Sequence, residues 1–95
     1  MHAAFHPPIA HDPQRQRFTL QQEGHEAELD YLVQDGRLVI THTGVPTAIG
    51  GRGLAAGLVT AALQYARAQG MTVVPACAYA ALFLQRHPEY ADLLG

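Results

Sequence analysis

The chain has 95 residues, of which 48% are hydrophobic and 15% are charged, and its formal net charge is −2. This length and composition indicate one globular domain with a modest two-layer core and exclude a disordered chain. Without a basic excess or a long apolar run, neither nucleic acid nor a membrane is an expected partner. One cysteine allows no internal disulfide and no signal-peptide pattern is visible, so a cytoplasmic location is expected.

The first fifteen residues contain three of the chain's six prolines and are expected to form a flexible, irregular leader. One domain is expected to follow it, over residues 16–95. Six histidines raise the question of a metal site, but Cys77 has no cysteine partner, and His2, His6 and His11 fall in the leader. All six are interpreted as ordinary surface residues, and no metal is expected.

Alternating apolar and polar residues predict two strands, over residues 17–24 and 25–36. The Asp35-Gly36 pair is typical of a tight hairpin turn and leads into a return strand over residues 37–43. Three antiparallel strands are therefore expected. Their inward side chains are predicted to be Phe18, Leu20, Ala27, Leu29, Tyr31 and Val33.

The second half of the chain alternates helix, strand and helix. After a loop over residues 44–53, apolar residues at positions 54, 58, 59, 62, 63 and 66 predict a helix over 54–69 that Gly70 ends. Residues 71–77 predict a short buried strand ended by Pro75. Residues 78–87 return to the helical period with Ala81, Phe83 and Leu84 inward, and Pro88 begins a last helical turn. The fold class is α/β, a mixed sheet with helices packed on it.

Three glycines in four residues stand where the long helix begins, at positions 50, 51 and 53. Glycine allows unusual dihedral angles there, so that free backbone N–H groups and the helix dipole can converge on a phosphate. Arg52 would add a charge to a second phosphate or point to solvent. The loop is neither a GxGxxG motif, because position 56 is alanine, nor a nucleotide P-loop, because no Lys-Ser/Thr follows. A glycine turn that serves only tight packing is the alternative.

This arrangement resembles the GCN5-related N-acetyltransferases. Their Gln/Arg-x-x-Gly-x-Gly/Ala signature at a strand–loop–helix junction matches residues 48–53, with Ala48 in place of the usual Arg or Gln. The resemblance is nearest to small YjdJ-like single-domain acetyltransferases and covers roughly residues 18–94. It is carried by "THTGVP", "GGRGLAAGLVTAAL", "GMTVVPACAY" and "HPEYADLL".

The resemblance implies a compact fold in which an antiparallel β-meander is followed by β-loop-α-β-α. It implies acetyl-CoA as co-substrate and a primary amine, of a small molecule or a protein, as acceptor. Backbone N–H groups of residues 49–54 would bind the diphosphate, and the pantetheine arm would lie where the strands on either side of the long helix splay apart. The implied donor-binding residues are Thr43, Gly44, Val45, Ile49, Gly50, Gly51, Arg52, Gly53, Leu54, Ala55, Val73 and Pro75.

Three residues are candidates for catalysis. Cys77 follows the second of these strands at a helix start, which favours a thiolate, and would act as a transient acetyl carrier or as a proton donor to the CoA thiolate. Its alternative is a small packing residue. Tyr79 is a candidate general acid, by resemblance to larger relatives, or a half-buried packing residue. His42 could deprotonate an amine or hydrogen-bond a loop carbonyl.

Two other functions remain open. A domain that binds CoA or acetyl-CoA as a sensor or interaction module would keep the loop and have less need of Cys77. A compact domain whose glycines serve only packing would not bind CoA. The sequence leaves the acceptor and the oligomeric state undetermined.

Overall fold

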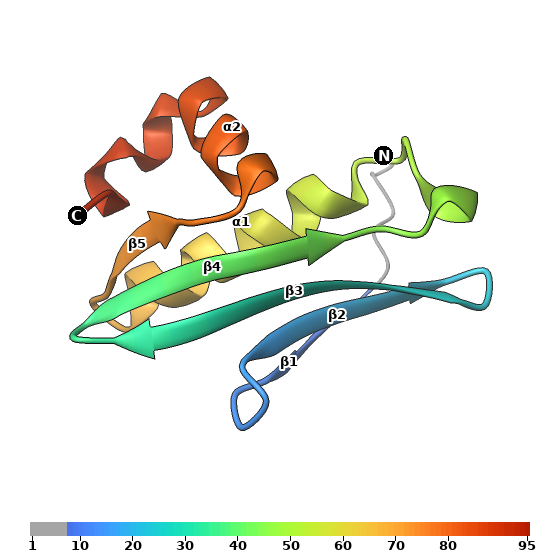
Figure 1. Ribbon diagram of the computed structural model, residues 1–95, viewed down its shortest axis with the longest axis horizontal. Helices are drawn as coiled ribbons and strands as arrows, with labels where there is room; N and C mark the ends of the chain where they lie inside the picture. The colour runs from blue at the N-terminus through green and yellow to red at the C-terminus, as the bar shows by residue number, and fades with distance from the viewer. Residues whose placement is uncertain (1–7) are drawn as a thin grey trace, which may run out of the picture.

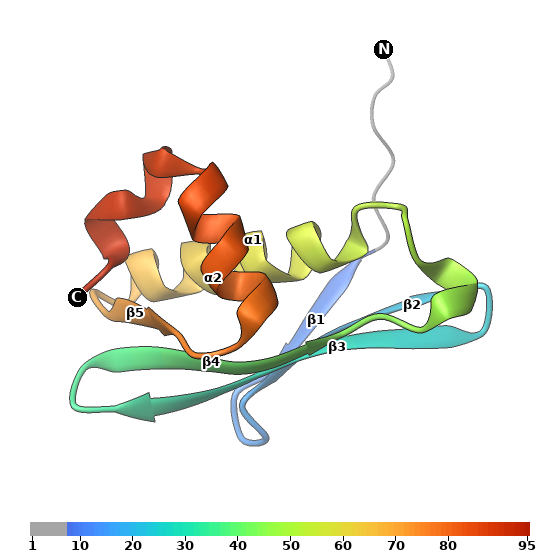
Figure 2. The ribbon, with the colours of Figure 1, turned by 45° about the horizontal axis from the view of Figure 1, so that its top comes forward.

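The computed structural model describes residues 8–95, which form one five-stranded sheet with the helices on one of its faces (Figure 1, Figure 2). The predicted α/β class and the predicted order of strand, loop, helix, strand and helix are confirmed. Within these residues, no helix is long and apolar enough to cross a membrane. In chain order the elements are β1 (Ile9–Asp12), β2 (Arg17–Gln22), β3 (His25–Gln34), β4 (Arg37–Gly44), η1 (Thr47–Ile49), α1 (Leu54–Ala68), β5 (Thr72–Pro75), α2 (Ala78–Arg86) and η2 (Pro88–Leu93).

The prediction of an irregular leader is wrong where β1 lies. Ile9–Asp12 pairs antiparallel with β2 and makes the meander four-stranded instead of three-stranded. The prediction of a surface histidine is also wrong for His11, whose ring stacks on Phe18 at 4.0 Å and whose Nε2 lies 2.6 Å from the Tyr31 hydroxyl. Burial lowers the pKa of His11, and the charge of Asp12 partly opposes this. The leader predictions for residues 1–7, with His2 and His6, lie outside the described residues.

Two hairpin turns of the same kind set the register of the central strands. The Asp35-Gly36 turn between β3 and β4 has φ values of 52° and 75°, and Glu23-Gly24 between β2 and β3 has φ values of 53° and 78°. Positive φ at both central residues is the geometry that suits the twist of a two-residue hairpin. The predicted turn at Asp35 is therefore confirmed.

A register shift in β4 changes which side chains face the helices. Tyr31 pairs with Ile40, but Asp30 pairs with His42, so Thr41 is an extra residue in β4. Such a bulge reverses the alternation of the residues that follow it. Thr43 consequently shares the helix-covered face with its buried partner Leu29, and His42 lies on the opposite, open face.

β4 and β5 are parallel neighbours over only part of their length. The pairing runs from Arg37↔Thr72 to Ile40↔Pro75, while β4 continues to Gly44. Beyond the pairing, the N–H groups of Ala76 and Cys77 both donate to the Ile40 carbonyl, at 2.9 and 3.1 Å. The chain after β5 therefore leaves the sheet at the Ile40 carbonyl, and the rest of β4 has no strand beside it on this side.

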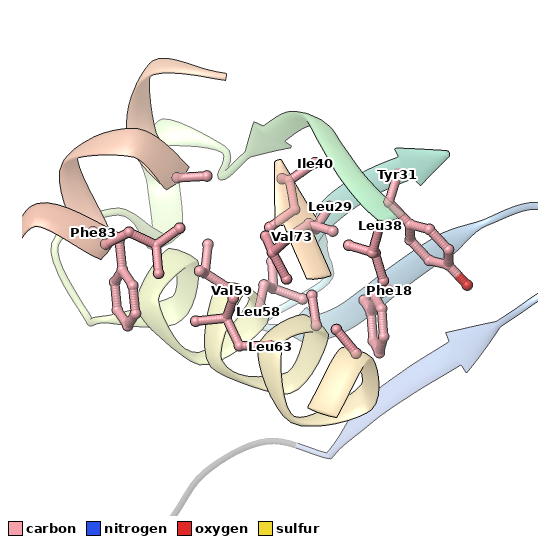
Figure 3. Packing of buried hydrophobic residues seen from close by; sticks show 14 of the residues in the cluster. Phe18, Leu29, Tyr31, Leu38, Ile40, Leu58, Val59, Leu63, Val73 and Phe83 are labelled. Carbon is pink, nitrogen blue, oxygen red and sulfur yellow. The ribbon is translucent and has the colours of Figure 1, made fainter. Parts of the chain in front are cut away.

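The core lies between the sheet and α1, and α2 closes one side of it (Figure 3). The six predicted apolar positions of α1 are its six buried residues. On α2 the buried alanine is Ala80 instead of the predicted Ala81, beside Phe83 and Leu84. Val33 was predicted to face inward but is 44% exposed, whereas its β4 partner Leu38 is fully buried. The pairing of β2 with β3 reaches only Asp30, so Val33 lies beyond the end of β2.

Candidate functional site

The start of α1 has no side-chain cap. Gly53 is the N-cap residue with φ +77°, no side chain accepts a hydrogen bond there, and the first turn carries no acidic residue. The first intrahelical bond of this end runs from the Gly57 N–H to the Gly53 carbonyl. The N–H groups of the first helical turn, before Gly57, are therefore left to solvent or a ligand. Together with the helix dipole, they favour an anion.

The loop before α1 uses some of its N–H groups internally. In η1 and just after it, Ile49 donates to the Pro46 carbonyl at 3.0 Å and Gly50 donates to the Thr47 carbonyl at 3.1 Å. The Ile49 side chain is fully buried. Among the predicted N–H donors, the open ones therefore begin at Gly51, whose φ of +75° turns the chain into the helix.

A shallow pocket of about 240 Å³ lies beside this loop. No charged side chain lines it, so its attraction for an anion would come from the backbone. Tyr79 reaches it from the start of α2, and burial raises the pKa of its phenol, with Arg86 opposing. The lining residues are Val45, Gly50, Gly51, Gly53, Leu54, Ala55 and Tyr79.

Arg52 is exposed and also pairs with a carboxylate that was not predicted to contact it. Its guanidinium forms a two-point ion pair with the carboxylate of Glu23, on the turn between β2 and β3. The hydrogen bond between them raises the pKa of Arg52 and lowers the pKa of Glu23. Arg52 does not line the pocket that its glycine neighbours line. The pairing of Glu23 with Arg52 was not predicted from the sequence, although glutamate is an unusual residue before the glycine of a two-residue hairpin turn.

Cys77 lies where β4 and the chain after β5 separate. Its sulfur accepts a hydrogen bond from the Ala80 N–H at 3.4 Å and caps α2. The Thr43 hydroxyl of β4 lies 3.5 Å from the same sulfur. Cys77 is partly buried and unpaired among the described residues. This side-chain contact links the end of β4 to the residues that follow β5.

The three catalytic candidates are not brought together. Tyr79 lines the glycine-loop pocket, whereas His42 lies on the open face of the sheet, where its Nε2 lies 3.1 Å from Glu28 Oε2. Gly44 is packed against this pair, because a Cβ at Gly44 would lie 2.8 Å from His42 Nε2. Only Cys77 stands at the separation of β4 from the chain after β5.

Two further predicted donor-binding residues lie in β5. The Val73 side chain is buried in the core, and its backbone pairs with Leu38 of β4 and with Leu94. Pro75 pairs with Ile40 at the last position before the strands separate. Over residues 8–95, no group of three metal-ligating side chains occurs.

A second pocket of about 460 Å³ lies on the other flank of α1. It is mainly apolar and lies between the helix and the strands β1 and β2. This pocket was not predicted from the sequence, because β1 was not predicted. Its lining is Ile9, Leu20, Gly53, Leu54, Ala56, Gly57, Thr60, Ala61 and Gln64.

The chain is similar to known proteins in sequence and in structure. The family model described as GCN5-related N-acetyl-transferase matches residues 17–93, from the first residue of β2 to the last of η2. A solution NMR structure of a GCN5-like candidate N-acetyltransferase from Staphylococcus aureus matches with a TM-score of 0.74 and 26% sequence identity. That match covers 93% of this chain and 87% of the S. aureus chain.

Proposed function

This chain belongs to the GCN5-related N-acetyltransferase family and is an acyltransferase, and on that premise we propose that it transfers an acetyl group from acetyl-CoA to a primary amine. The amine belongs to a small molecule or to a protein lysine. The uncapped start of α1 behind Gly51 and Gly53 is the observation that carries the proposal. It supplies what a diphosphate needs, namely converging N–H groups at the positive end of a helix dipole.

The donor would lie along the pocket that Gly51, Gly53 and Tyr79 line. A Cβ at Gly51 or Gly53 would meet no heavy atom within 4 Å, so the space beside both residues is open. The N–H groups of Gly51 to Ala55 would hold the diphosphate. Val45 and the part of β4 that β5 leaves unpaired would guide the pantetheine arm toward Cys77.

The reacting end would lie at the contact between Thr43 and Cys77. In transfer through the thiol, the Cys77 sulfur attacks the thioester carbonyl, the bond to the CoA sulfur breaks, and the thiol proton goes to the departing CoA. The amine then attacks the acetyl-cysteine, which returns the thiol. In direct transfer the amine attacks the thioester, and Cys77 or Tyr79 gives a proton to the CoA thiolate.

Calorimetric titration with acetyl-CoA, followed by intact mass measurement, tests this proposal. The chain has six arginines and no lysine, so an added acetyl group has Cys77 and the α-amino group as its amine or thiol acceptors. Cys77→Ser is the matched variant, because serine is a good N-cap and should preserve the start of α2. A mass gain in the wild type that is absent in the variant supports transfer through the thiol.

Other outcomes of the same experiment separate the alternatives. Turnover of a primary amine in both proteins without the mass gain supports direct transfer. Failure to bind acetyl-CoA at about millimolar concentration, a free energy near −4 kcal/mol, would overturn the proposal.

A CoA-binding module with little transfer activity is the second candidate. The position of His42 favours it, since this candidate base lies across the sheet from Cys77 and is held by Glu28. Binding of acetyl-CoA without turnover of any amine in a broad panel would select this function.

A further inference from the structure

Arg52 is the sole cationic residue between Gly44 and Ala55, the segment that would hold the donor. Its neighbours Gly51 and Gly53 line the pocket, but its own side chain is directed to Glu23, 29 residues earlier in the chain. The guanidinium that lies nearest in sequence to the proposed diphosphate site is therefore paired with a carboxylate of the same chain.

Glu23 is an unusual residue for its place in the backbone. It has φ +53° in the first central position of a two-residue hairpin, where Asn, Asp or Gly is preferred. The other hairpin of this kind has the preferred Asp35 in the equivalent position. An unfavourable residue in only one of two equivalent turns indicates that its side chain has a role outside the turn. That role is the ion pair with Arg52, which the Glu23 carboxylate reaches from the turn.

We propose that Glu23 sets the affinity for the donor by competing with its diphosphate for Arg52. The proposal rests on the proposed function of the glycine loop. When the donor binds, Arg52 exchanges the carboxylate for phosphate oxygens, and when CoA leaves, Glu23 takes the guanidinium back. Glu23 thereby weakens CoA binding and speeds CoA release.

The exchange is physically easy. Both side chains are substantially exposed, at 38% for Arg52 and 61% for Glu23, and such pairs are weak and screened by salt. Glycine on both sides of Arg52 leaves the space beside the loop open, so rotation of its side-chain bonds suffices. A diphosphate carries more negative charge than one carboxylate and offers a guanidinium the same planar, two-point contact.

Glu23→Gln tests the proposal with CoA as the probe, by calorimetry and by the dissociation rate. The affinity should rise about threefold at low ionic strength, the combined scale of one exposed ion pair and one screened charge. The dissociation rate should fall by a similar factor. Near 1 M salt, where the Debye length is about 3 Å, the gain should nearly vanish.

Three controls make the result specific. Glu26→Gln removes the same charge from the same hairpin, but Glu26 bonds Gln21 instead of Arg52, so its affinity for CoA should stay at the wild-type value. In an Arg52→Gln background, the Glu23→Gln gain should disappear. Pantetheine, which lacks the diphosphate, should show no gain.

The outcomes distinguish this proposal from the function on which it rests. Wild type that binds CoA, with Glu23→Gln binding equally or more weakly, overturns the competition and identifies the pair as a support of the loop. An equal gain in Glu26→Gln also overturns it, since a general charge effect is then sufficient. If no variant binds CoA, the proposed function fails as well.

Discussion

Gly51 allows the glycine loop to be perturbed in two separable steps. Its φ of +75° is one that side chains rarely adopt, yet a Cβ there would meet no heavy atom within 4 Å. Gly51→Ala should therefore cost conformational energy alone, about 1 kcal/mol. For a domain of this size that lowers Tm by about 4–8 °C. Its affinity for acetyl-CoA should fall less than that of Gly51→Glu, because the methyl group enters the space proposed for the donor but adds no charge.

Gly51→Glu adds a charge to the same backbone cost. A carboxylate about 5 Å from a diphosphate of two negative charges is repelled by about 1.5–2 kcal/mol even at the dielectric constant of water. That corresponds to a roughly tenfold to thirtyfold loss of affinity for acetyl-CoA. Calorimetric titration measures the affinity, and thermal melts followed by circular dichroism measure the stability.

Gly36 provides the matched control, because it has the same φ of +75° and the same open surroundings in the β3–β4 turn. Gly36→Glu should lower Tm as much as Gly51→Glu does and leave acetyl-CoA binding unchanged. If Gly51→Glu binds acetyl-CoA as well as the wild type does, the diphosphate does not lie on this loop. If both glutamate variants lose affinity equally, the loss reflects weakened folding.

Two further predictions concern the fold. Leu58→Ala empties a fully buried position of α1 and should lower the free energy of unfolding in urea by about 2–5 kcal/mol; a loss below about 1 kcal/mol would contradict the assigned core. His11, packed against Tyr31 and Tyr65 and beside Asp12, has a lowered pKa, so the unfolded chain binds more protons below the ordinary value of 6.5. The stability that neutral His11 contributes is complete above pH 6.5 and is lost as the pH falls through its lowered pKa in the folded state. The Tm of the wild type should therefore drop more between about pH 7.5 and 5.5 than the Tm of His11→Phe. Equal drops in Tm would refute this prediction.

The features that the sequence predicted well are local ones. The spacing of apolar residues in α1 names its buried face, because the helical period alone determines which side chains lie together. The Asp35-Gly36 turn and Gly70 after α1 likewise depend on backbone preferences of one or two residues. Gly70 adopts φ +71°, and the following Met71 N–H donates to the Ala66 carbonyl at 2.9 Å.

The features that the sequence did not reveal depend on contacts between distant residues. β1 was not predicted because prolines surround it in the sequence. It forms because Ile9–Asp12 pairs with β2 and because Tyr65 of α1 packs on His11. His42 continues the alternation of Leu38 and Ile40 in sequence, and the extra residue Thr41 moves it to the other face. For the candidate site, glycine spacing located the loop, and the pairing of Arg52 with a residue 29 positions away required the structure.

The parallel pairing of β4 with β5 also sets the order in which the chain can assemble. The four antiparallel strands pair with their neighbours in sequence across turns of a few residues, so their contacts close cheaply and early. β5 reaches β4 only after α1 has crossed between them, and Thr43 meets Cys77 across 34 residues of sequence. We therefore expect the contact between Thr43 and Cys77, where the acyl group is proposed to lie, to form last in folding. We also expect this contact to be the first to be lost in partial unfolding, while the antiparallel strands stay paired.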